Sequence, residues 1–427
     1  MDEVSHFAHR PEGFGGLLLH IPSERLQMVS QAQYAAAVGL LDGRPDGQID
    51  ESLRVEHGLA PATVDRLIAG TRTRLERPEA FEATPEMIRT FTENLTAPIN
   101  VVWQFTGACN LKCRHCFLPA EEHKAHQASP EGLLQIAEIL VRRNILIVRL
   151  SGGEPTCHPA LPDLLTILKS TPRHIKLLTN ATLVDDRLIA LIRRHVDSIS
   201  VSLDGASAAT HDRIRGLRGT FDRAIAGLRR IRGETALPVN VTTSICEDNL
   251  PEVGAIIDLC LELGIHSWKH TLTIPVGRAS RKGDAMLTEA QFADLMRAVE
   301  PYRNEPMVAS SIHLLDAYVE PEPAPTWCGG AFDEAAISPA GRLYPCAYVS
   351  GLGRYDAGSL LEADFDTLYR GEAFRAFRGD GEIEMSPDCK AIRLAYFDSL
   401  DPGRTVYDPA AIRAMLASRP SGSEQGS

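Results

Sequence analysis

The stretch Cys109-Asn110-Leu111-Lys112-Cys113-Arg114-His115-Cys116 places three cysteines in the spacing C-x3-C-x2-C. A short loop with this spacing can bind three irons of a [4Fe–4S] cluster, for which cysteine thiolate is the usual ligand. The fourth iron then has no protein ligand and stays open to chemistry. A structural zinc site and three buried apolar cysteines are the alternatives. Zinc usually takes a fourth Cys or His at regular spacing, and only His115, inside the run, is near.

This motif, followed by Phe117 and preceded by the strand-like residues 99–105, resembles the signature of the radical S-adenosylmethionine (radical SAM) superfamily. The resemblance implies that S-adenosylmethionine (SAM) chelates the open iron through its amine and carboxylate. It also implies that an electron from the cluster breaks a C–S bond and gives a 5′-deoxyadenosyl radical, which abstracts a hydrogen from an unactivated carbon. The protein would then orient cofactor and substrate and exclude competing reactions.

The composition is that of a globular protein with 427 residues, of which 44% are hydrophobic and 23% charged. This length allows two or three domains with a sizeable core. Because there is no run of eighteen apolar residues and the first residues are acidic, we expect a cytoplasmic protein without a membrane partner. The net charge of −12 argues against a nucleic-acid partner. Nine cysteines without an export signal indicate metal sites rather than disulfides.

The N-terminal residues predict a small α+β unit. The pattern indicates a hairpin at residues 15–21 and 26–29, followed by helices at 31–41, 49–57 and 62–76. This order is winged-helix-like, and winged helices commonly bind DNA. Residues 1–95, however, hold nine Arg and no Lys against fifteen Asp and Glu, a net charge of −6, which is the wrong sign for binding phosphate.

The segment Arg10-Pro11-Glu12-Gly13-Phe14-Gly15-Gly16-Leu17-Leu18, with the helices behind it, resembles the recognition element fused to maturases of ribosomally made peptides. The resemblance implies that a leader peptide is captured as an added strand at the edge of the hairpin. The partners we expect are a precursor peptide with its leader and an external reductant such as a flavodoxin or ferredoxin. A purely structural N-terminal domain is the alternative.

Strand-like and helix-like segments alternate along the following residues. The expected strands are 99–105, 146–151, 175–179, 198–203, 238–244 and 268–274, and the helices include 130–143, 188–195, 221–232 and 250–263. Strict alternation predicts a parallel sheet with helices outside, and six units fit an open, TIM-like (β/α)6 barrel, which is also the fold that the resemblance implies. Ligands of such barrels gather at the carboxyl ends of the strands.

Several motifs follow these expected strands. The paired glycines of Ser151-Gly152-Gly153-Glu154-Pro155 would let the backbone approach a ligand closely, and the run matches the family's Gly-Gly-Glu element, which implies a contact with the amino group of SAM. Asn180 ends the third strand, and Ser202, at the end of the fourth, resembles a ribose or carboxylate contact. Arg215 offers a planar, bidentate donor for the SAM carboxylate, with Arg223 as a rival.

A second set of cysteines follows the barrel. Cys328, Gly341 and Cys346 form the pattern C-x12-G-x4-C, which predicts a hairpin that brings both cysteines together. The pattern resembles the SPASM/twitch extension, the auxiliary iron–sulfur domain of many peptide-modifying radical SAM enzymes, and Cys389 continues it. The resemblance implies that these three cysteines hold an auxiliary [4Fe–4S] cluster near the barrel.

The chain departs from a full SPASM domain because the cysteines of the distal cluster are missing, and Asp408-Pro409 is followed by two alanines. We therefore expect one auxiliary cluster in a truncated domain. Its fourth iron is either open or bound by a residue such as Asp333 or Asp388. A zinc site made of the same three cysteines is the alternative.

Three cysteines lie outside both sets. Cys260 falls on an apolar helix face and is expected in the core. Cys157 and Cys246 follow strand ends near the mouth of the barrel, so either could donate a hydrogen atom to a substrate radical. Simple packing is the alternative for both.

We expect five segments: a recognition domain at 1–80, a linker at 81–96, a radical SAM partial barrel at 97–305, the SPASM/twitch domain at 306–412 and a disordered tail at 413–427. The expected function is a radical SAM oxidoreductase that crosslinks side chains of a precursor peptide, with the auxiliary cluster accepting the second electron. Alternatives are peptide epimerisation, modification of a small molecule such as a tetrapyrrole or sugar, and a non-catalytic iron–sulfur carrier. The Gly-Gly-Glu element and Arg215 argue against a carrier, which has no use for a SAM pocket.

Overall fold

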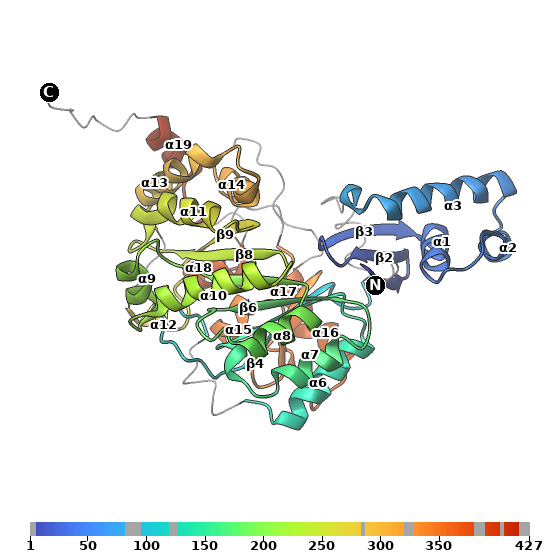
Figure 1. Cartoon of the computed structure of the whole chain (residues 1–427), viewed down its shortest axis with the longest axis horizontal. Coiled ribbons are helices and arrows are strands. Elements are labelled where there is room, and N and C mark those ends of the chain that lie inside the picture. The colour runs from blue at the N-terminus through green and yellow to red at the C-terminus, as the bar shows by residue number, and fades with distance from the viewer. Residues whose placement is uncertain are drawn as a thin grey trace.

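The computed structural model describes residues 6–81, 95–118, 127–282, 287–319, 328–379, 389–401 and 405–417. Its strands form a three-stranded sheet near the N-terminus and a nine-stranded sheet that makes up the body of the molecule (Figure 1). Within these residues, no helix combines the length and the hydropathy needed to cross a bilayer.

The three-stranded sheet is antiparallel, in the order β1 (Phe7–Glu12), β2 (Gly15–His20) and β3 (Arg25–Ser30). The helices α1 (Gln31–Leu41), α2 (Asp46–His57) and α3 (Pro61–Glu76) follow, then a short 3₁₀ turn at Pro78–Ala80. The expected hairpin and three helices are present. The sequence did not predict β1, because its Arg-Pro-Glu end has low strand propensity.

Buried polar contacts attach this N-terminal unit to the body. The guanidinium of Arg10 donates to the carbonyls of Ala97 at 2.6 Å and Pro98 at 2.8 Å, and it pairs with Glu12 at 2.7 Å. Glu24, in the turn before β3, pairs with Lys176 at 3.0 Å. The unit therefore packs against the end of the sheet where the barrel strands begin.

Six parallel strands form the predicted partial barrel, each paired with the next along the chain. They are β4 (Asn100–Thr106), β5 (Ile147–Gly152), β6 (His174–Thr179), β7 (Ser198–Ser202), β8 (Val239–Ile245) and β9 (Ser267–Leu272). Every boundary lies within two residues of the expected one. The strands alternate with helices because each β-branched or aromatic strand, such as the one carrying buried Trp103 and Phe105, needs an apolar helix face to cover it.

The helices of the body cover the outside of this sheet (Figure 1). They are α6 (Pro130–Arg142), α7 (Leu161–Leu168), α8 (Asp186–His195), α9 (Ala208–Arg215), α10 (Thr220–Glu234), α11 (Val253–Glu262), α12 (Arg278–Lys282), α13 (Glu289–Val299) and α14 (Ala309–Asp316), with 3₁₀ turns at Pro155–Cys157, Leu250–Glu252, Glu300–Tyr302 and Pro306–Val308. The helix expected from residue 250 begins as one of these turns, since Pro251 lies in it.

The C-terminal strands extend the same sheet. β10 (Glu334–Ile337) pairs in parallel with β4, and β11 (Arg342–Tyr344) and β12 (Gly358–Ser359) continue the edge. The expected hairpin turns at Gly341, whose φ of 74° suits glycine. The remaining helices are α15 (Ala347–Leu352), α16 (Phe365–Tyr369), α17 (Glu372–Arg378), α18 (Lys390–Phe397) and α19 (Pro409–Ala417).

The expected tail is wrong for residues 413–417, because α19 continues to Ala417. Its Ile412 is buried, and the carbonyl of Met415 accepts a hydrogen bond from Arg297, so the helix is anchored to the body. Residues 418–427, like most of the expected linker, lie outside the described residues. The division at 80, 97, 306 and 412 is a proposal about folding units, and the shared sheet shows that the last two units are continuous.

Candidate active site

The cysteine loop follows β4 and is held by the backbone of two other segments. The amides of Lys112 and Arg114 donate to the carbonyls of Arg215 and Ile214, at 3.3 and 2.9 Å, where α9 ends. Arg278, at the start of α12, donates from its backbone amide to Cys116 and from its side chain to the carbonyl of Cys113, both at 2.9 Å. The loop geometry is therefore set by the barrel and not by the loop sequence alone.

Glycines line the loop where no side chain could fit. A Cβ on Gly153 would lie 2.2 Å from the carbonyl oxygen of Ala108, well inside contact distance. The same holds for Gly152, Gly216 and Gly277, whose added Cβ atoms would lie 2.3, 2.5 and 2.5 Å from the carbonyl oxygens of residues 106, 112 and 116. The paired glycines expected to approach a ligand thus bring the end of β5 against the cysteine loop.

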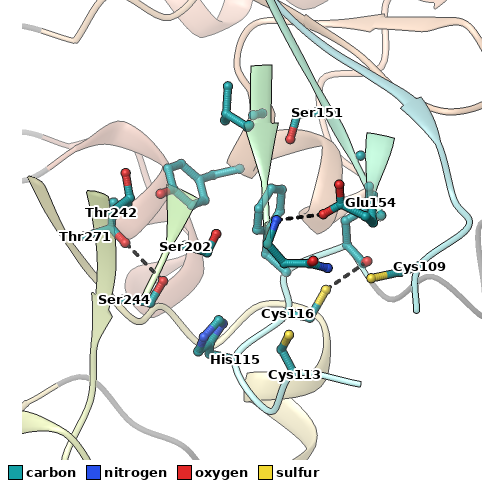
Figure 2. Close-up of a pocket in the computed structure, with 18 of the residues that line it drawn as sticks. Cys109, Cys113, His115, Cys116, Ser151, Glu154, Ser202, Thr242, Ser244 and Thr271 are labelled. Atoms are coloured by element: carbon teal, nitrogen blue, oxygen red, sulfur yellow. Dashed lines mark hydrogen bonds between the residues drawn. The ribbon is translucent and has the colours of Figure 1, made fainter. Parts of the chain in front are cut away.

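A cavity of about 420 Å³ opens at the carboxyl ends of the barrel strands. Figure 2 shows the three cysteines of the loop on one side of it and the hydroxyl groups of Ser202, Thr242, Ser244 and Thr271 on the other. The expected site residues that line it are Cys109, Cys113, Cys116, Gly152, Gly153, Glu154, Asn180, Ser202 and Arg215. These residues therefore share one cavity, while their roles as ligands stay a prediction.

Glu154 is a fixed carboxylate in this wall, with only 1% of its surface exposed. Its oxygens accept hydrogen bonds from the hydroxyls of Thr156 and Thr179 and from the amide of Asn180, each at 2.7 Å. Burial raises the pKa of Glu154, and these donors oppose the rise. A cationic group bound in the cavity would stabilise the buried carboxylate of Glu154. The amino group of an amino acid is such a cation.

Asn180 supports the loop. Its side-chain amide donates to the side-chain oxygen of Asn110 at 2.9 Å, while its own oxygen accepts from the hydroxyl of Thr182 at 2.6 Å. Asn110 also donates to Thr182 at 2.9 Å. The end of β6 thus holds the first half of the cysteine loop in place.

Arg215 lies where the sequence predicted, but its guanidinium is engaged by the protein. It pairs with the buried Asp204 at 2.7 Å and points a second nitrogen at the sulfur of Cys113, 3.7 Å away. Arg223, the rival, is exposed on α10 and does not line the cavity. The expected contact with a SAM carboxylate would have to compete with these two partners.

The thiols of the loop suit an iron–sulfur cluster. Cys109, Cys113 and Cys116 are all free of disulfides, and burial raises the pKa of Cys109 to about 12 and also raises that of Cys116. Neighbouring thiolates need the positive charge of bound iron in such a place. His115, the nearby candidate for a fourth zinc ligand, directs its Nε2 to Asp204 at 2.7 Å.

The second set of cysteines comes together from three segments. The thiols of Cys328 and Cys389 form a hydrogen bond, which raises the pKa of Cys328, together with burial, and lowers that of Cys389. A Cβ on Gly330 would lie 3.5 Å from both the sulfur of Cys328 and the Cβ of Cys346. Cys346 is buried, and Cys328 and Cys389 are half-buried. Thiols are the ligand type that a cluster or a zinc ion takes, but among the described residues no three such side chains are already arranged around a metal position.

The fourth ligand of this second set has two candidates from the sequence. Asp333 faces Gly329, whose added Cβ would lie 2.2 Å from its carboxylate, whereas Gly330 faces the cysteines. Burial and the charge of Glu334 raise the pKa of Asp333 to about 7. The Oδ1 of Asp333 is buried without a hydrogen-bond partner among the described residues, and its role as a fourth ligand stays a prediction. Asp388 lies outside the described residues.

The three remaining cysteines differ in position. Cys260 is fully buried in α11, as expected for a core residue. Cys157 and Cys246 are partly buried, and neither lines the described cavity. Burial raises the pKa of Cys246 to about 11, so its thiol stays protonated. Their role as hydrogen-atom donors stays a prediction.

The sequence analysis missed several residues that line the cavity, among them Arg149, Glu334 and Tyr348. Arg149 on β5 pairs with Glu24 at 3.3 Å and with Glu334 at 3.7 Å. The ring of Tyr348 lies 5.3 Å from that of Phe117, between centroids. The sequence did contain a signal for Arg149, because it is the single charged residue in an otherwise apolar strand. Glu334 and Tyr348 reach the cavity only through the pairing of β10 with β4, which no local pattern predicts.

Comparisons with known proteins agree with this arrangement. The profile of the radical SAM superfamily matches residues 103–276, and that of SPASM, an iron–sulfur cluster-binding domain, matches residues 328–391. An AdoMet-dependent heme synthase of Oleidesulfovibrio alaskensis is 26% identical over 71% of this chain and 83% of its own length. A PqqA peptide cyclase of Gluconobacter oxydans is 27% identical over 58% of this chain and 70% of its own.

Among solved structures, that of Streptococcus suis SuiB bound to the precursor peptide SuiA covers 86% of this chain and 88% of its own, with a TM-score of 0.62 and 14% identity. At this identity the likeness concerns the fold. It extends over most of the chain, so the overall architecture is shared.

The partial barrel, the loop of three thiols and the cavity at the strand ends suit an iron–sulfur enzyme, the class that the two matching profiles indicate. The chain is a radical SAM enzyme with a C-terminal SPASM domain. Its radical SAM domain binds a [4Fe–4S] cluster and SAM, and its SPASM domain binds auxiliary iron–sulfur.

Proposed function

We propose that this enzyme modifies a ribosomally made precursor peptide, and that it forms an oxidative crosslink between side chains of that peptide. The observation that carries the proposal is a strand edge on the N-terminal unit with which none of the described strands pairs, in a unit that is attached directly to the barrel. A radical SAM enzyme acting on a small molecule has no evident need for such an edge.

The edge is that of β3. The opposite edge of the sheet, β1, is less suited to strand addition. It contains Pro11, which has no N–H, and the carbonyl of His9 already accepts a hydrogen bond from Asn144 at 2.8 Å. Among the described residues no strand pairs with the outer side of β3. An extended leader peptide could add to β3 through backbone hydrogen bonds. The acidic N-terminal unit would favour a leader with basic residues.

The site residues take these roles in the proposal. Cys109, Cys113 and Cys116 bind the cluster that receives SAM, and Cys328, Cys346 and Cys389 bind one auxiliary [4Fe–4S] cluster. SAM would lie against Gly152, Gly153 and Glu154, with Ser202 near its ribose or carboxylate. The cluster and SAM together supply the radical that removes one substrate hydrogen. An external flavodoxin or ferredoxin would supply the electron, with no nucleic acid or membrane as partner.

A crosslink removes two hydrogens from the peptide. One leaves as a hydrogen atom to the deoxyadenosyl group, and the second leaves as a proton and an electron when the new bond forms. The second electron needs an acceptor, and in this proposal it is the auxiliary cluster bound by Cys328, Cys346 and Cys389. The position of Tyr348, which lines the cavity and lies near Cys346 and Cys389, supports this role.

Two other functions keep specific support. The heme synthase relative favours modification of a tetrapyrrole. Epimerisation would use a thiol such as Cys157 or Cys246 to return a hydrogen atom to the peptide. The non-catalytic carrier is wrong, because the radical SAM relatives are enzymes.

The test uses the reconstituted full chain with SAM and dithionite. Peptides encoded by short reading frames beside its gene are assayed next to a porphyrin precursor. We expect one peptide to lose two mass units, and the Cys113→Ala variant to leave it unchanged. Consumption of the porphyrin precursor, with every peptide unaltered, would replace this proposal by the tetrapyrrole function.

A further inference from the structure

Asp204 lies directly behind the cysteine loop, two residues beyond Ser202 at the end of β7, and it is completely buried. One carboxylate oxygen accepts from Arg215 and from the Nε2 of His115, both at 2.7 Å. The other accepts from the amide of Ser244 at 2.9 Å. Figure 2 shows His115 at the cavity wall between Cys113 and Ser244. Asp204 therefore joins the loop to β8 and to α9.

Arg215 connects this carboxylate with a sulfur. Its side chain is 8% exposed. One of its terminal nitrogens donates to Asp204, and the other donates to the sulfur of Cys113 at 3.7 Å. The last carbonyls of α9, those of Ile214 and Arg215, accept hydrogen bonds from the amides of Arg114 and Lys112, so the backbone of Arg215 is tied to the loop as well. The planar fork holds both partners at once, which a lysine could not do.

The charges around the pair are few. Burial would raise the pKa of Asp204, but Arg215 and His115 outweigh it and hold the pKa well below its usual range. His211 accepts from the amide of Asp204 at 3.1 Å, and burial lowers its pKa to about 4, so it is neutral. Arg114 in the same loop pairs with Asp248 at 2.6 Å. Arg215 contacts the sulfur of Cys113, and Arg278 is a second cation beside the loop, next to Cys116.

We propose that Arg215 and Asp204 together set the reduction potential of the cluster bound by the cysteine loop, with Arg215 as the donor to Cys113 and Asp204 as its counter-charge. The proposal rests on the ligand set proposed above. It assigns Arg215 a positioning and charge role in place of the expected contact with the SAM carboxylate.

The physical basis is the negative charge that the cluster gains. One electron from an external reductant enters the cluster, and no bond or proton changes at Arg215. A cationic hydrogen-bond donor at a thiolate stabilises the reduced form and raises the potential, whereas an anion behind it weakens that effect. The two side chains should therefore act in opposite directions.

The experiment measures the midpoint potential of the full chain without SAM by EPR-monitored titration. The relevant signal is the one that Cys113→Ala removes. Arg215→Gln should shift the potential to more negative values, and Asp204→Asn should shift it to less negative values. Arg213→Gln is the matched control, since Arg213 is on the same helix but is half exposed and paired with Asp248. The midpoint potential of this variant should equal that of the unmodified chain.

Loss of a buried charge partner can unfold a protein, so iron content and circular dichroism are measured for each variant. A further variant, Arg215→Lys, keeps the positive charge but lacks the planar guanidinium that donates to two partners. Arg215→Lys should give a smaller negative shift than Arg215→Gln. Folded, iron-loaded variants with unchanged potentials would overturn the proposal. So would an affinity for SAM that falls more than about tenfold in Arg215→Gln at constant potential. Retention of the full EPR signal in Cys113→Ala would instead contradict the ligand set itself.

Discussion

At the scale of single residues, the site depends on backbone contacts that only glycine permits. Gly153 and its neighbours let carbonyl groups of the cysteine loop approach β5 and α9 without intervening side chains. The backbone of the loop is thereby held against the barrel. Preorganisation of this kind reduces the ordering cost of cluster assembly.

We expect Gly153→Ala to prevent correct assembly of the loop. The new Cβ would lie 2.2 Å from the carbonyl of Ala108, so either β5 or the loop must move, at a cost of about 1–3 kcal/mol. Iron content and yield of 5′-deoxyadenosine should both fall. Gly233→Ala is the control, because Gly233 lies in α10 with open space around its Cβ position. A variant with unchanged iron content would show that the loop tolerates displacement.

The mass of the product separates crosslinking from epimerisation. A crosslink lowers the peptide mass by two units, and we expect this loss to disappear in Cys346→Ala, since the second electron then has no acceptor. Replacing Cys157 or Cys246 by Ala should leave the crosslink intact. An unchanged mass in light water, with one deuterium gained in heavy water and lost in either thiol variant, would identify an epimerase.

Asp333 makes stability depend on pH. Its pKa is raised to about 7 in the folded chain by burial and by Glu334, above its value in the unfolded chain. The folded state therefore binds the proton more tightly, and stability falls as pH rises from about 4 to about 7. The measurement is the free energy of unfolding by urea at pH 5 and at pH 8. We expect Asp333→Asn to reduce the difference between these two values by about 2 kcal/mol. The same difference in both proteins would assign the pH dependence to other groups.

At the scale of elements, the alternation of strands and helices was predictable because each parallel strand carries a continuous apolar run and each helix an apolar face. β1 was missed, since its charged and proline-containing end is stabilised by contacts with residues 97 and 98 that are distant in sequence. α19 was missed in part because a short helix at the chain end depends on packing against α13.

The site was predictable where a motif is local and unpredictable where it depends on pairing. The cysteine loop and Glu154 follow from spacing and from position at strand ends. The partners of Arg215 do not, because Asp204 and Cys113 lie 11 and 102 positions away and meet it only in the barrel. Arg149 and Glu334 are likewise brought together by the pairing of β5, β4 and β10.

The turn between β2 and β3 attaches the N-terminal unit to the barrel through Glu24. Its carboxylate pairs with Lys176 and Arg149, and despite burial these charges lower the pKa of Glu24 to about 2. We expect Glu24→Gln to destabilise this attachment by about 2 kcal/mol, because the side chain is partly exposed and the loss is less than for a fully buried pair. Limited proteolysis between the two units should accelerate.

Glu51→Gln is the control for this variant. Glu51 is exposed on α2, so the change removes one negative charge from the same unit without removing a contact to the barrel. Equal proteolysis of Glu24→Gln and Glu51→Gln would show that the attachment depends on Arg10 and its neighbours instead.

At the scale of the whole molecule, one sheet joins both sets of cysteines. β10 pairs with β4, so the segment that begins at Cys328 lies beside the strand that leads into the cysteine loop. Tyr348, two residues after Cys346, contacts Phe117, which follows Cys116, and both rings line the cavity. The cavity is thus bounded by segments from both sets of cysteines.

The central claim is that the loop from Cys109 to Cys116 holds the cluster that cleaves SAM. The most direct measurement is 5′-deoxyadenosine formed from SAM and dithionite by the anaerobically reconstituted chain, with iron content determined in parallel. We predict two clusters in the unmodified chain. We also predict that the triple variant Cys109→Ala, Cys113→Ala and Cys116→Ala keeps one cluster and forms no 5′-deoxyadenosine. Continued formation of 5′-deoxyadenosine by the folded triple variant would contradict the assignment.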